Sequence, residues 1–536
     1  MKVISLKQLF RSNLKSALVL FCLITTAVHA EPPSWVRATS FGGSGEDLSY
    51  AIAIGPDDQQ YVTGGFSSTA QFAGTTLVSV GGRDIFLAKY RRSGKLLWIV
   101  QAGGPDDDSG QALALDRAGN VYLTGWFTNS ATFGSTNGAT KTVTGMGQAT
   151  IFLAKYRSSG ALVWVQTGDA PFDALNNGYG VAVDAVAGTV YMTGRAQGDT
   201  TFSSANGTVN TVPGATTWHM FLAKYDTGGN FQWGQTNQAS PNSFSNSVAV
   251  DAKDNAYVTG WLEDTTTFSS NNGSDITVAG FSPAQTTGDF PGDAFLAKYD
   301  RNGNVKWVNH IGGYKGMGSG VAVSPTGEVS IVGFIGNINF GSPAEAETIV
   351  TSEPPGANIN LGGGDFTNPY NQDVLIVTYD AAGVLQRALR NGGSEQEVAT
   401  GIAYGLRGNL YVTGVFLGTI DQPNLFVQKY SGKRLLWTKT AANAGVWIPN
   451  NTTISPAVSV DHAGRVFVTG GYQGTASLAV SRCTALGHRT YSWQNWHRTR
   501  WRGSKRCVAC FSPNPSGQLR SVGVLSAVAG TPALRN

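Results

Sequence analysis

The sequence predicts an all-β fold, namely a seven-bladed β-propeller of four-stranded antiparallel blades in which an N-terminal strand closes the last blade. The main observation is a repeated motif of an aromatic residue, an aliphatic residue, Thr and Gly. Its copies end at Gly64, Gly125, Gly194, Gly260, Gly333 (a degenerate copy), Gly414 and Gly470. Their spacing of 56 to 81 residues is the size of a supersecondary unit. The composition agrees, because 69 Gly, 10% aromatic and only 13% charged residues are typical of a turn-rich all-β protein.

Each repeat is predicted to hold four strands. The first alternates small and aliphatic residues, as in 51–54, which suits a crowded place near a central axis. A tight turn such as 116–120 leads into the motif strand. The third strand reads Phe-Leu-Ala-Lys-Tyr at 86–90, and the fourth carries Trp98. Four strands in each of seven repeats predict a propeller.

The two ends of the repeat region predict closure. Trp35 followed by Gly42-Gly43 repeats the pattern of Trp98 followed by Gly103-Gly104, so the mature chain starts with a fourth strand that lacks the first three. Its partners are expected in the last repeat, at residues 457–460 and 466–470. Pairing the two ends in one blade removes the free edges that an open array would expose.

The repeat resembles a known family. The run from Val248 to Gly260, followed by 293–299, Gly303 and Trp307, is similar to the bacterial seven-bladed β-propeller repeat family called SBBP repeats. The resemblance covers about Trp35 to Leu478. It implies a fold and export from the cell. It transfers no active site, because the family is largely uncharacterised.

The first thirty residues have the features of a signal peptide. Four basic residues precede the apolar run 17–24, and small residues stand before Glu31. The run is too short for a permanent membrane anchor, and no later stretch is apolar for long enough to cross a membrane. The expected domains are therefore a signal peptide at 1–30 and a propeller at 31–480. We expect a monomer that is periplasmic, on the cell surface or secreted.

Residues 481–536 do not follow the repeat. They hold nine Lys or Arg and no Asp or Glu, which leaves the rest of the chain at −5, so the basic excess is no argument for a nucleic-acid partner. Where the last third strand is due, residues 489–495 break the pattern, and a reading frame shifted by two nucleotides allows Asp-Ile-Phe-Leu-Ala-Lys-Leu. We therefore interpret this tail as frameshifted or disordered. The alternative is a genuine basic appendage, whose Cys507 and Cys510 lack a second pair to complete a zinc site.

The segments between second and third strands are long, from about 66–84 to 334–374, whereas the opposite turns are tight. Long loops on a rigid scaffold are the usual place for binding, so we predict a ligand-binding face there. Its most capable residues are Trp218, His219, Asp293, Phe366 and Tyr370. For each one singly, local packing of a loop residue is the alternative interpretation.

Residues that recur at one register are expected to be structural. The repeated lysines should lie with their aliphatic stems along the inter-blade surface and their ammonium groups in water. They are Lys89, Lys155, Lys224, Lys298 and Lys429. The repeated tryptophans are expected to pack between blades.

No catalytic residue or metal site is predicted, and no cofactor. Outside the signal peptide and the tail only His219, His310 and His462 remain, and His462 lies in a turn of the opposite face. Nucleophile-elbow and phosphate-loop motifs are missing from the sequence. Acidic patches at 46–47, 106–108 and 395–397 offer ligands for calcium, but solvated turn acids are the favoured interpretation.

Three classes of function fit this sequence. We favour an exported non-catalytic propeller that binds an extracellular protein or glycan through the long-loop face. The second class is a propeller enzyme, because 226–229 with Trp233 resembles the tryptophan-docking turn of quinone-dependent dehydrogenases and 300–307 loosely resembles the sialidase Asp-box. Further site residues of both families are missing. The third class is a cell-surface structural repeat protein.

Overall fold

The computed structural model describes residues 34–43, 45–146, 148–170, 175–239, 242–280, 292–312, 316–336, 349–350, 359–360, 372–392, 396–417, 423–444, 456–478 and 519–528. These residues form antiparallel β-sheets and contain no helix, which confirms the all-β prediction. Consequently none of them belongs to a helix long and apolar enough to span a membrane. The predicted signal peptide, Phe366 and Tyr370 lie outside the described residues.

The strands pair in groups of four, antiparallel and in chain order. The first three groups are β2 (Asp47–Ile54), β3 (Gln60–Phe72), β4 (Thr75–Tyr90) and β5 (Leu96–Gly103); β6 (Asp108–Leu115), β7 (Val121–Phe127), β10 (Thr150–Tyr156) and β11 (Leu162–Asp169); and β12 (Asn177–Asp184), β13 (Thr189–Gln197), β16 (Trp218–Asp226) and β17 (Phe231–Ala239). The next are β18 (Ser243–Val250), β19 (Ala256–Leu262), β22 (Asp293–Tyr299) and β23 (Val305–Gly312); β24 (Met317–Val323), β25 (Val329–Gly336), β28 (Gln372–Tyr379) and β29 (Leu385–Asn391); and β30 (Gln396–Tyr404), β31 (Leu410–Leu417), β32 (Pro423–Ser431) and β33 (Arg434–Ala444).

A last group joins the two ends of the chain. It pairs β34 (Ala457–Val460) with β35 (Val466–Leu478), β35 with β36 (Leu519–Val528), and β36 with β1 (Ser34–Gly43). The segment at Trp35 therefore lies in the same sheet as the strand at Val468, and both side chains belong to one core cluster. Residues 519–528 of the tail form β36, which lies where the third strand of this group is expected. The frameshift interpretation of the tail stays a prediction.

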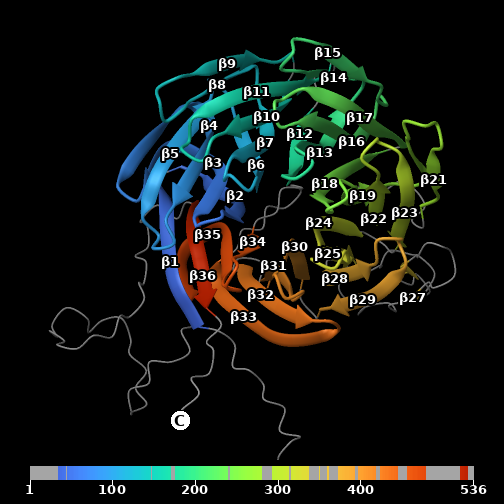
Figure 1. The fold of residues 1–536 in the computed structure, drawn as a ribbon. Helices are drawn as coiled ribbons and strands as arrows, with labels where there is room; N and C mark the ends of the chain where they lie inside the picture. The colour runs from blue at the N-terminus through green and yellow to red at the C-terminus, as the bar shows by residue number, and fades with distance from the viewer. Residues whose placement is uncertain are drawn as a thin grey trace, which may run out of the picture.

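The first strands of the groups lie innermost. Figure 1 shows the sheets arranged around a common centre, with the long outer strands at the periphery. Each innermost strand contacts the next in the order β2, β6, β12, β18, β24, β30, β34 and back to β2. The approach is close enough that a Cβ on Gly180 would stand 3.0 Å from Ser247 Cα, and one on Gly401 would stand 3.1 Å from Ala457 Cα. The small residues predicted near the axis serve this packing.

The threonine and the glycine of the repeated motif have separate roles. Thr63 Oγ1 donates to Phe86 O at 2.7 Å, which ties the second strand to the third, and four further repeats make the same bond. The glycine faces the start of the first strand. A Cβ on Gly64 or on Gly125 would stand 1.9 Å from a carbonyl oxygen of that strand, so only glycine fits.

The predicted long loops are largely hairpins, and this part of the prediction was wrong. β8 (Ser130–Phe133) and β9 (Lys141–Thr144), β14 (Thr200–Ser203) and β15 (Val209–Val212), β20 (Thr266–Phe268) and β21 (Ile276–Val278), and β26 (Ile349–Val350) and β27 (Ile359–Asn360) form such hairpins. Each pairs with the outer strand of the preceding group, namely β5, β11, β17 or β23. In the same way, the extended end of β3 pairs with β1, and the extended end of β35 pairs with β33. The hairpins therefore cover sheet edges that would otherwise stay unpaired.

The match between Trp35 and Trp98 was wrong by two residues. Gly43 N donates to Asp47 Oδ2, and Gly104 N donates to Asp108 Oδ2 in the same way, so Gly43 corresponds to Gly104. Counting back equally from these two glycines aligns Trp98 with Arg37 and not with Trp35. Arg37 Nη1 donates to Arg92 O at 3.2 Å, and Trp98 Nε1 donates to the corresponding Ser158 O at 3.2 Å. The Trp35 side chain instead contacts the preceding group, where its Nε1 donates to Thr440 O in β33.

Candidate functional site

A central cavity of about 250 Å³ is lined by β2, β6, β12, β18, β24, β30 and β34. Its walls come in three layers. The aliphatic layer is Leu113, Val181, Val248, Val321, Ile402 and Val458, and the small layer is Ala51, Ala112, Gly180, Ser247, Gly320, Gly401 and Ala457. The third layer, which we call the rim, is Tyr50, Gln111, Tyr179, Asn246, Ser319 and Thr400. Among the residues that the structure describes, no charged side chain lines this cavity.

Every rim residue is the extra residue of a β-bulge. In β2, Ser49 pairs with Gly64 and Ala51 pairs with Thr63, so Tyr50 has no partner opposite it. The register shifts in the same way at Gln111, Tyr179, Asn246, Ser319 and Thr400. A bulge re-aims one side chain without ending the strand, which is why bulges are common at functional sites.

The motif glycine makes the bulge possible. Each glycine pairs with the residue just before the bulge, as Gly125 does with Gly110. A Cβ there would stand 1.9 Å from Ser109 O, and Gly194, Gly260, Gly333 and Gly414 show distances of 1.8 to 2.1 Å to the equivalent carbonyl oxygens. The repeat signature therefore fixes a backbone geometry that turns one side chain per repeat toward the cavity.

The rim side chains are held by the protein but keep polar atoms for the cavity. Gln111 Nε2 donates to Ser109 Oγ at 2.8 Å, Asn246 Nδ2 donates to Gly318 O at 2.9 Å, and Thr400 Oγ1 donates to Pro456 O at 2.5 Å. Ser319 differs, because its Oγ is buried and has no hydrogen-bond partner among the described residues. An unpaired buried hydroxyl is costly and calls for an explanation.

The rim lies on the long-loop side of the molecule. In β2 the bulge comes three residues after the strand begins at the inter-group connection, while the tight turn follows the far end of the strand. On this side Arg195 contacts both the rim residue Tyr179 and the predicted site residue Trp218. Its guanidinium carbon lies 5.8 Å from the centre of the Tyr179 ring and 4.6 Å from that of Trp218, and its Nε donates to Leu175 O.

Two of the other predicted site residues, His219 and Asp293, lie in the interior. His219 is fully buried, its Nδ1 lies 3.2 Å from Thr217 O, and burial lowers the pKa of its ring. Asp293 is also fully buried, and His310 Nε2 lies 2.8 Å from its Oδ2. The structure thus brings Trp218 to the rim through Arg195 and assigns His219 and Asp293 to local packing. Ligand contact by these residues stays a prediction.

The acidic patches are not simply solvated turns. Asp47 and Asp108 are fully buried and accept backbone N–H bonds at the junctions between groups. Burial raises the pKa of Asp108 to about 7, with the charges of Asp84 and Asp107 adding to the effect and bonds from Thr128 and Gly104 opposing it. The described residues contain no group of three or more His, Cys, Asp or Glu placed to hold a metal ion.

The repeated lysines perform one structural task. The side chains of Lys89 and Lys224 are buried and do not reach into water as predicted, whereas Lys155, Lys298 and Lys429 are partly exposed. Lys89 Nζ donates to Ser158 O, in the turn of the next group, and lies 4.8 Å from the centre of the Tyr61 ring. Lys155, Lys224 and Lys298 make the corresponding pair of contacts. Burial lowers the pKa of Lys89. The tryptophans do pack between groups, as Trp164 does against Gly229.

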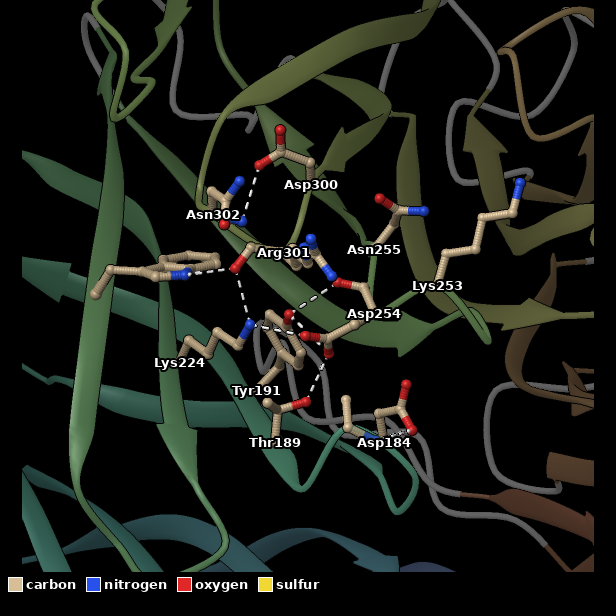
Figure 2. Close-up of polar contacts among 12 residues, drawn as sticks. Asp184, Thr189, Tyr191, Lys224, Lys253, Asp254, Asn255, Asp300, Arg301 and Asn302 are labelled. Atoms are coloured by element: carbon tan, nitrogen blue, oxygen red, sulfur yellow. Dashed lines mark hydrogen bonds and ion pairs between the residues drawn. The ribbon is translucent and has the colours of Figure 1, made fainter.

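One of these lysines also forms a buried ion pair. Figure 2 shows Lys224 between Asp254 and the carbonyl of Arg301. The Nζ lies 2.8 Å from Asp254 Oδ2, and both side chains are less than a tenth exposed. Thr189 and Tyr191 donate to the same carboxylate. All five residues have partners within this network. We therefore interpret the cluster as a structural link between two strand groups and not as a ligand-binding site.

Sequence reasoning missed the rim because a bulge shifts the register by one residue only. The available signal was a break in the small-aliphatic alternation of the first strand, where one polar or aromatic residue intrudes in each repeat. Tyr50 and Gln111 are examples.

Comparison with known proteins agrees with this architecture. Residues 97–134 match the beta-propeller repeat family SBBP, which confirms the resemblance. The chain carries an SBBP beta-propeller repeat. An uncharacterized WD repeat-containing protein of Acanthamoeba polyphaga mimivirus is 24% identical over 239 residues, which are 40% of this chain and 16% of that protein. The match therefore spans only about a sixth of that relative.

Solved structures give distant matches. The beta-propeller domain of Cps50 (Swd1) from Myceliophteria thermophila is 9% identical, with 67% of this chain and 93% of that chain covered and a TM-score of 0.28. A streptogramin B lyase is 11% identical, with 71% and 96% covered and a TM-score of 0.26.

Proposed function

We propose that this chain is an exported, non-catalytic β-propeller of seven four-stranded blades, closed by its N-terminal strand, that binds an extracellular protein or glycan through its long-loop face. The observation that carries the proposal is the rim. One side chain from each of six first strands is turned into a common cavity, and every one of them is uncharged and able to hydrogen-bond.

The strand contacts support the count of blades. The innermost strands contact one another in a cycle of seven, and each begins a group of four paired strands. The pairing of β1 with β36 supports closure by the N-terminal strand. A ring of this kind leaves the cavity as the one place where all blades can contact a single ligand.

The chemistry of the cavity favours binding over catalysis. Its lining supplies hydroxyls, amides and apolar walls, and it holds no acid-base pair. The turn that resembles a quinone-docking motif has a structural use, since Thr227 O accepts bonds from Lys155 Nζ and Trp164 Nε1. We therefore place the propeller enzyme second among the candidate functions.

Export is proposed from the basic and apolar pattern of residues 1–30. Cleavage before Glu31 is tested by N-terminal mass analysis of the protein recovered from the producing cells. Recovery of the intact Met1 terminus only inside the cell would contradict export.

Binding is tested by presenting the purified full chain to immobilised glycans and to extracellular proteins of the producing cells. We expect saturable binding that falls at least tenfold in Trp218→Ala and stays unchanged in Asn302→Ala on the turn face. A chain that captures no protein or glycan would contradict the proposal and favour a cell-surface structural repeat. Turnover of a captured compound would favour the enzyme.

A further inference from the structure

We propose that the central cavity binds one uncharged sugar unit of a glycan, which is held by the rim residues Tyr50, Gln111, Tyr179, Asn246, Ser319 and Thr400. This inference rests on the proposed binding function and names its ligand class. It starts from a comparison within the chain, because six repeats share one bulge geometry and differ in the residue that each bulge displays.

The variation among rim residues has a pattern. Where a repeat position is structural, the same residue type recurs, as Lys89 does in its row and Thr63 in its own. The rim position instead shows Tyr, Gln, Tyr, Asn, Ser and Thr, which share hydrogen-bonding capacity and little else. A backbone requirement alone does not select six polar side chains. A ligand that presents several hydroxyl groups in different directions would select polar side chains at all six positions.

The charge of the cavity selects a neutral ligand. Burying an ionised group without a counter-charge is costly, and the cavity lining offers none. Two basic residues near the rim have partners of their own. Arg83 Nη1 lies 3.8 Å from Glu46 Oε2, and Arg195 lies between the rings of Tyr179 and Trp218. The phenol of Tyr50 is uncharged near neutral pH, and burial raises its pKa further.

The layers of the cavity match the two surfaces of a sugar. A pyranose has an apolar face of C–H groups and an equator of hydroxyls. The rim tyrosines are largely buried and present only their cavity-lining edges to the first, and the amides and hydroxyls of Gln111, Asn246 and Ser319 line the cavity beside the second. The volume of about 250 Å³ lies below the range typical of drug-sized ligands, which limits the occupant to about one ring.

Ser319 provides the sharpest structural argument. Its Oγ is buried without a partner among the described residues, although it lines the cavity. Buried hydroxyls without a partner among the described residues also occur away from the cavity, as at Tyr225 and Tyr299, so the argument depends on the place of Ser319 in the cavity lining. A ligand hydroxyl at the rim would supply the missing partner.

The first experiment measures binding of the full chain to a panel of neutral and acidic oligosaccharides. The neutral probes are gluco-, galacto-, manno-, xylo- and chito-oligosaccharides, and the acidic probes are uronate-containing and sialylated ones. We expect at least one neutral probe to bind and the matched acidic probe to bind at least tenfold more weakly. Equal or tighter binding of the acidic probe would overturn the inference.

The second experiment uses Ser319→Ala, which removes only the unpaired hydroxyl. We expect about a fivefold to tenfold loss of affinity for the neutral probe, because one hydrogen bond is lost. The melting temperature of the free protein should stay the same or rise. A lower melting temperature with unchanged affinity would mean that the hydroxyl is structural and would overturn the inference.

A third variant separates this inference from the proposed function. Ser319→Phe fills the cavity, and Ser93→Phe in an exposed turn of the opposite face is its control. Loss of sugar binding in Ser319→Phe alone supports the inference. Binding to a protein that survives Ser319→Phe but is lost in Trp218→Ala would overturn the sugar site and leave the proposed function standing. Binding that neither variant alters would contradict both.

Discussion

The tight-turn face and the long-loop face of this molecule use polar residues in opposite ways. On the turn face, a lysine recurs at one register and bonds to the neighbouring group, as Lys89 does to Ser158 O, while aspartates such as Asp116 recur and accept bonds from the backbone of their own turns. At the rim, one bulged backbone recurs and its side chain varies. Repetition of a side chain indicates a structural role here, whereas variation on a repeated backbone indicates a surface adapted to something outside the chain.

The carboxylates divide in the same way. Burial acts to raise the pKa of Asp300 on the turn face, but bonds from Asn304 and Asn302 outweigh it and lower the pKa. On the loop face, burial is the stronger effect and raises the pKa of Asp84 and Asp108. Asp300 therefore stabilises the fold as an anion, while Asp84 and Asp108 are held at the cost of their charge; Asp461 shows that burial also raises the pKa of a turn carboxylate.

The largest expected effect comes from the residue that makes the bulge possible. Gly125→Val should destabilise the chain by about 4 kcal/mol or prevent folding, because its Cβ would meet Ser109 O at 1.9 Å. The measurement is chemical denaturation. Gly138→Asn is the control, since Gly138 has a positive φ and nothing within 4 Å, and asparagine tolerates that backbone. Equal losses in the two variants would contradict the link between the motif glycine and the bulge.

The next effect distinguishes two lysines in one row. Lys224→Met should cost about 3 kcal/mol, because it leaves the Asp254 carboxylate buried without its cation. Lys89→Met should cost about 1 kcal/mol, since its partner is a neutral carbonyl. Adding Asp254→Asn to Lys224→Met should recover part of the loss. Denaturation of all three variants checks this order, and the reverse order would show that the carboxylate is not desolvated.

The shifted pKa values of Asp108 and Asp300 predict how the stability of the fold changes with pH. The folded pKa of Asp108 is about 7 and lies above its ordinary value, so the folded state binds the proton more tightly. Its contribution is fully present below the unfolded pKa near 4 and is lost as the pH rises through the folded pKa of about 7. Asp300 has a lowered pKa, so its contribution is lost as the pH falls through that value.

Melting curves from pH 3 to 8 test both signs. Asp108→Asn should flatten the decline between pH 4 and 7, and Asp300→Asn should leave that decline in place. A decline of the same size in Asp108→Asn would show that another group is responsible.

The smallest effect concerns a described junction inside the chain where the repeated pair is replaced. Thr378 and Arg387 stand where other repeats have Lys and Trp, and a cavity of about 200 Å³ lies beside them. Thr378→Lys together with Arg387→Trp should stabilise the chain by about 1 kcal/mol by filling this space. A measured loss would mean that the guanidinium contact with Gly432 O matters more than the packing.

The sequence predicted those features whose cause is local or repeated. The Tyr-Val-Thr-Gly strands, the packing of Trp98 and the small first strands follow from residue type and period, and they appear as expected. The lysines were predicted as structural, but the burial of Lys89 and Lys224 was missed, because it depends on how closely the next turn approaches.

Features that depend on one residue of register were missed. The rim, the place of Arg37 and the pairing of the hairpins all rest on shifts of one or two positions, which alternation alone does not resolve. Of the predicted site residues, Trp218 lies beside the rim, His219 and Asp293 are interior, and the other two lie outside the described residues.

The most direct test is a crystal structure of the full chain grown with the neutral oligosaccharide that binds most tightly. We expect one sugar ring in the central cavity, with a hydroxyl within hydrogen-bond distance of Ser319 Oγ and its apolar face against Tyr50 or Tyr179. A sugar bound on the outer sheets or the turn face, with the rim empty, would contradict the account.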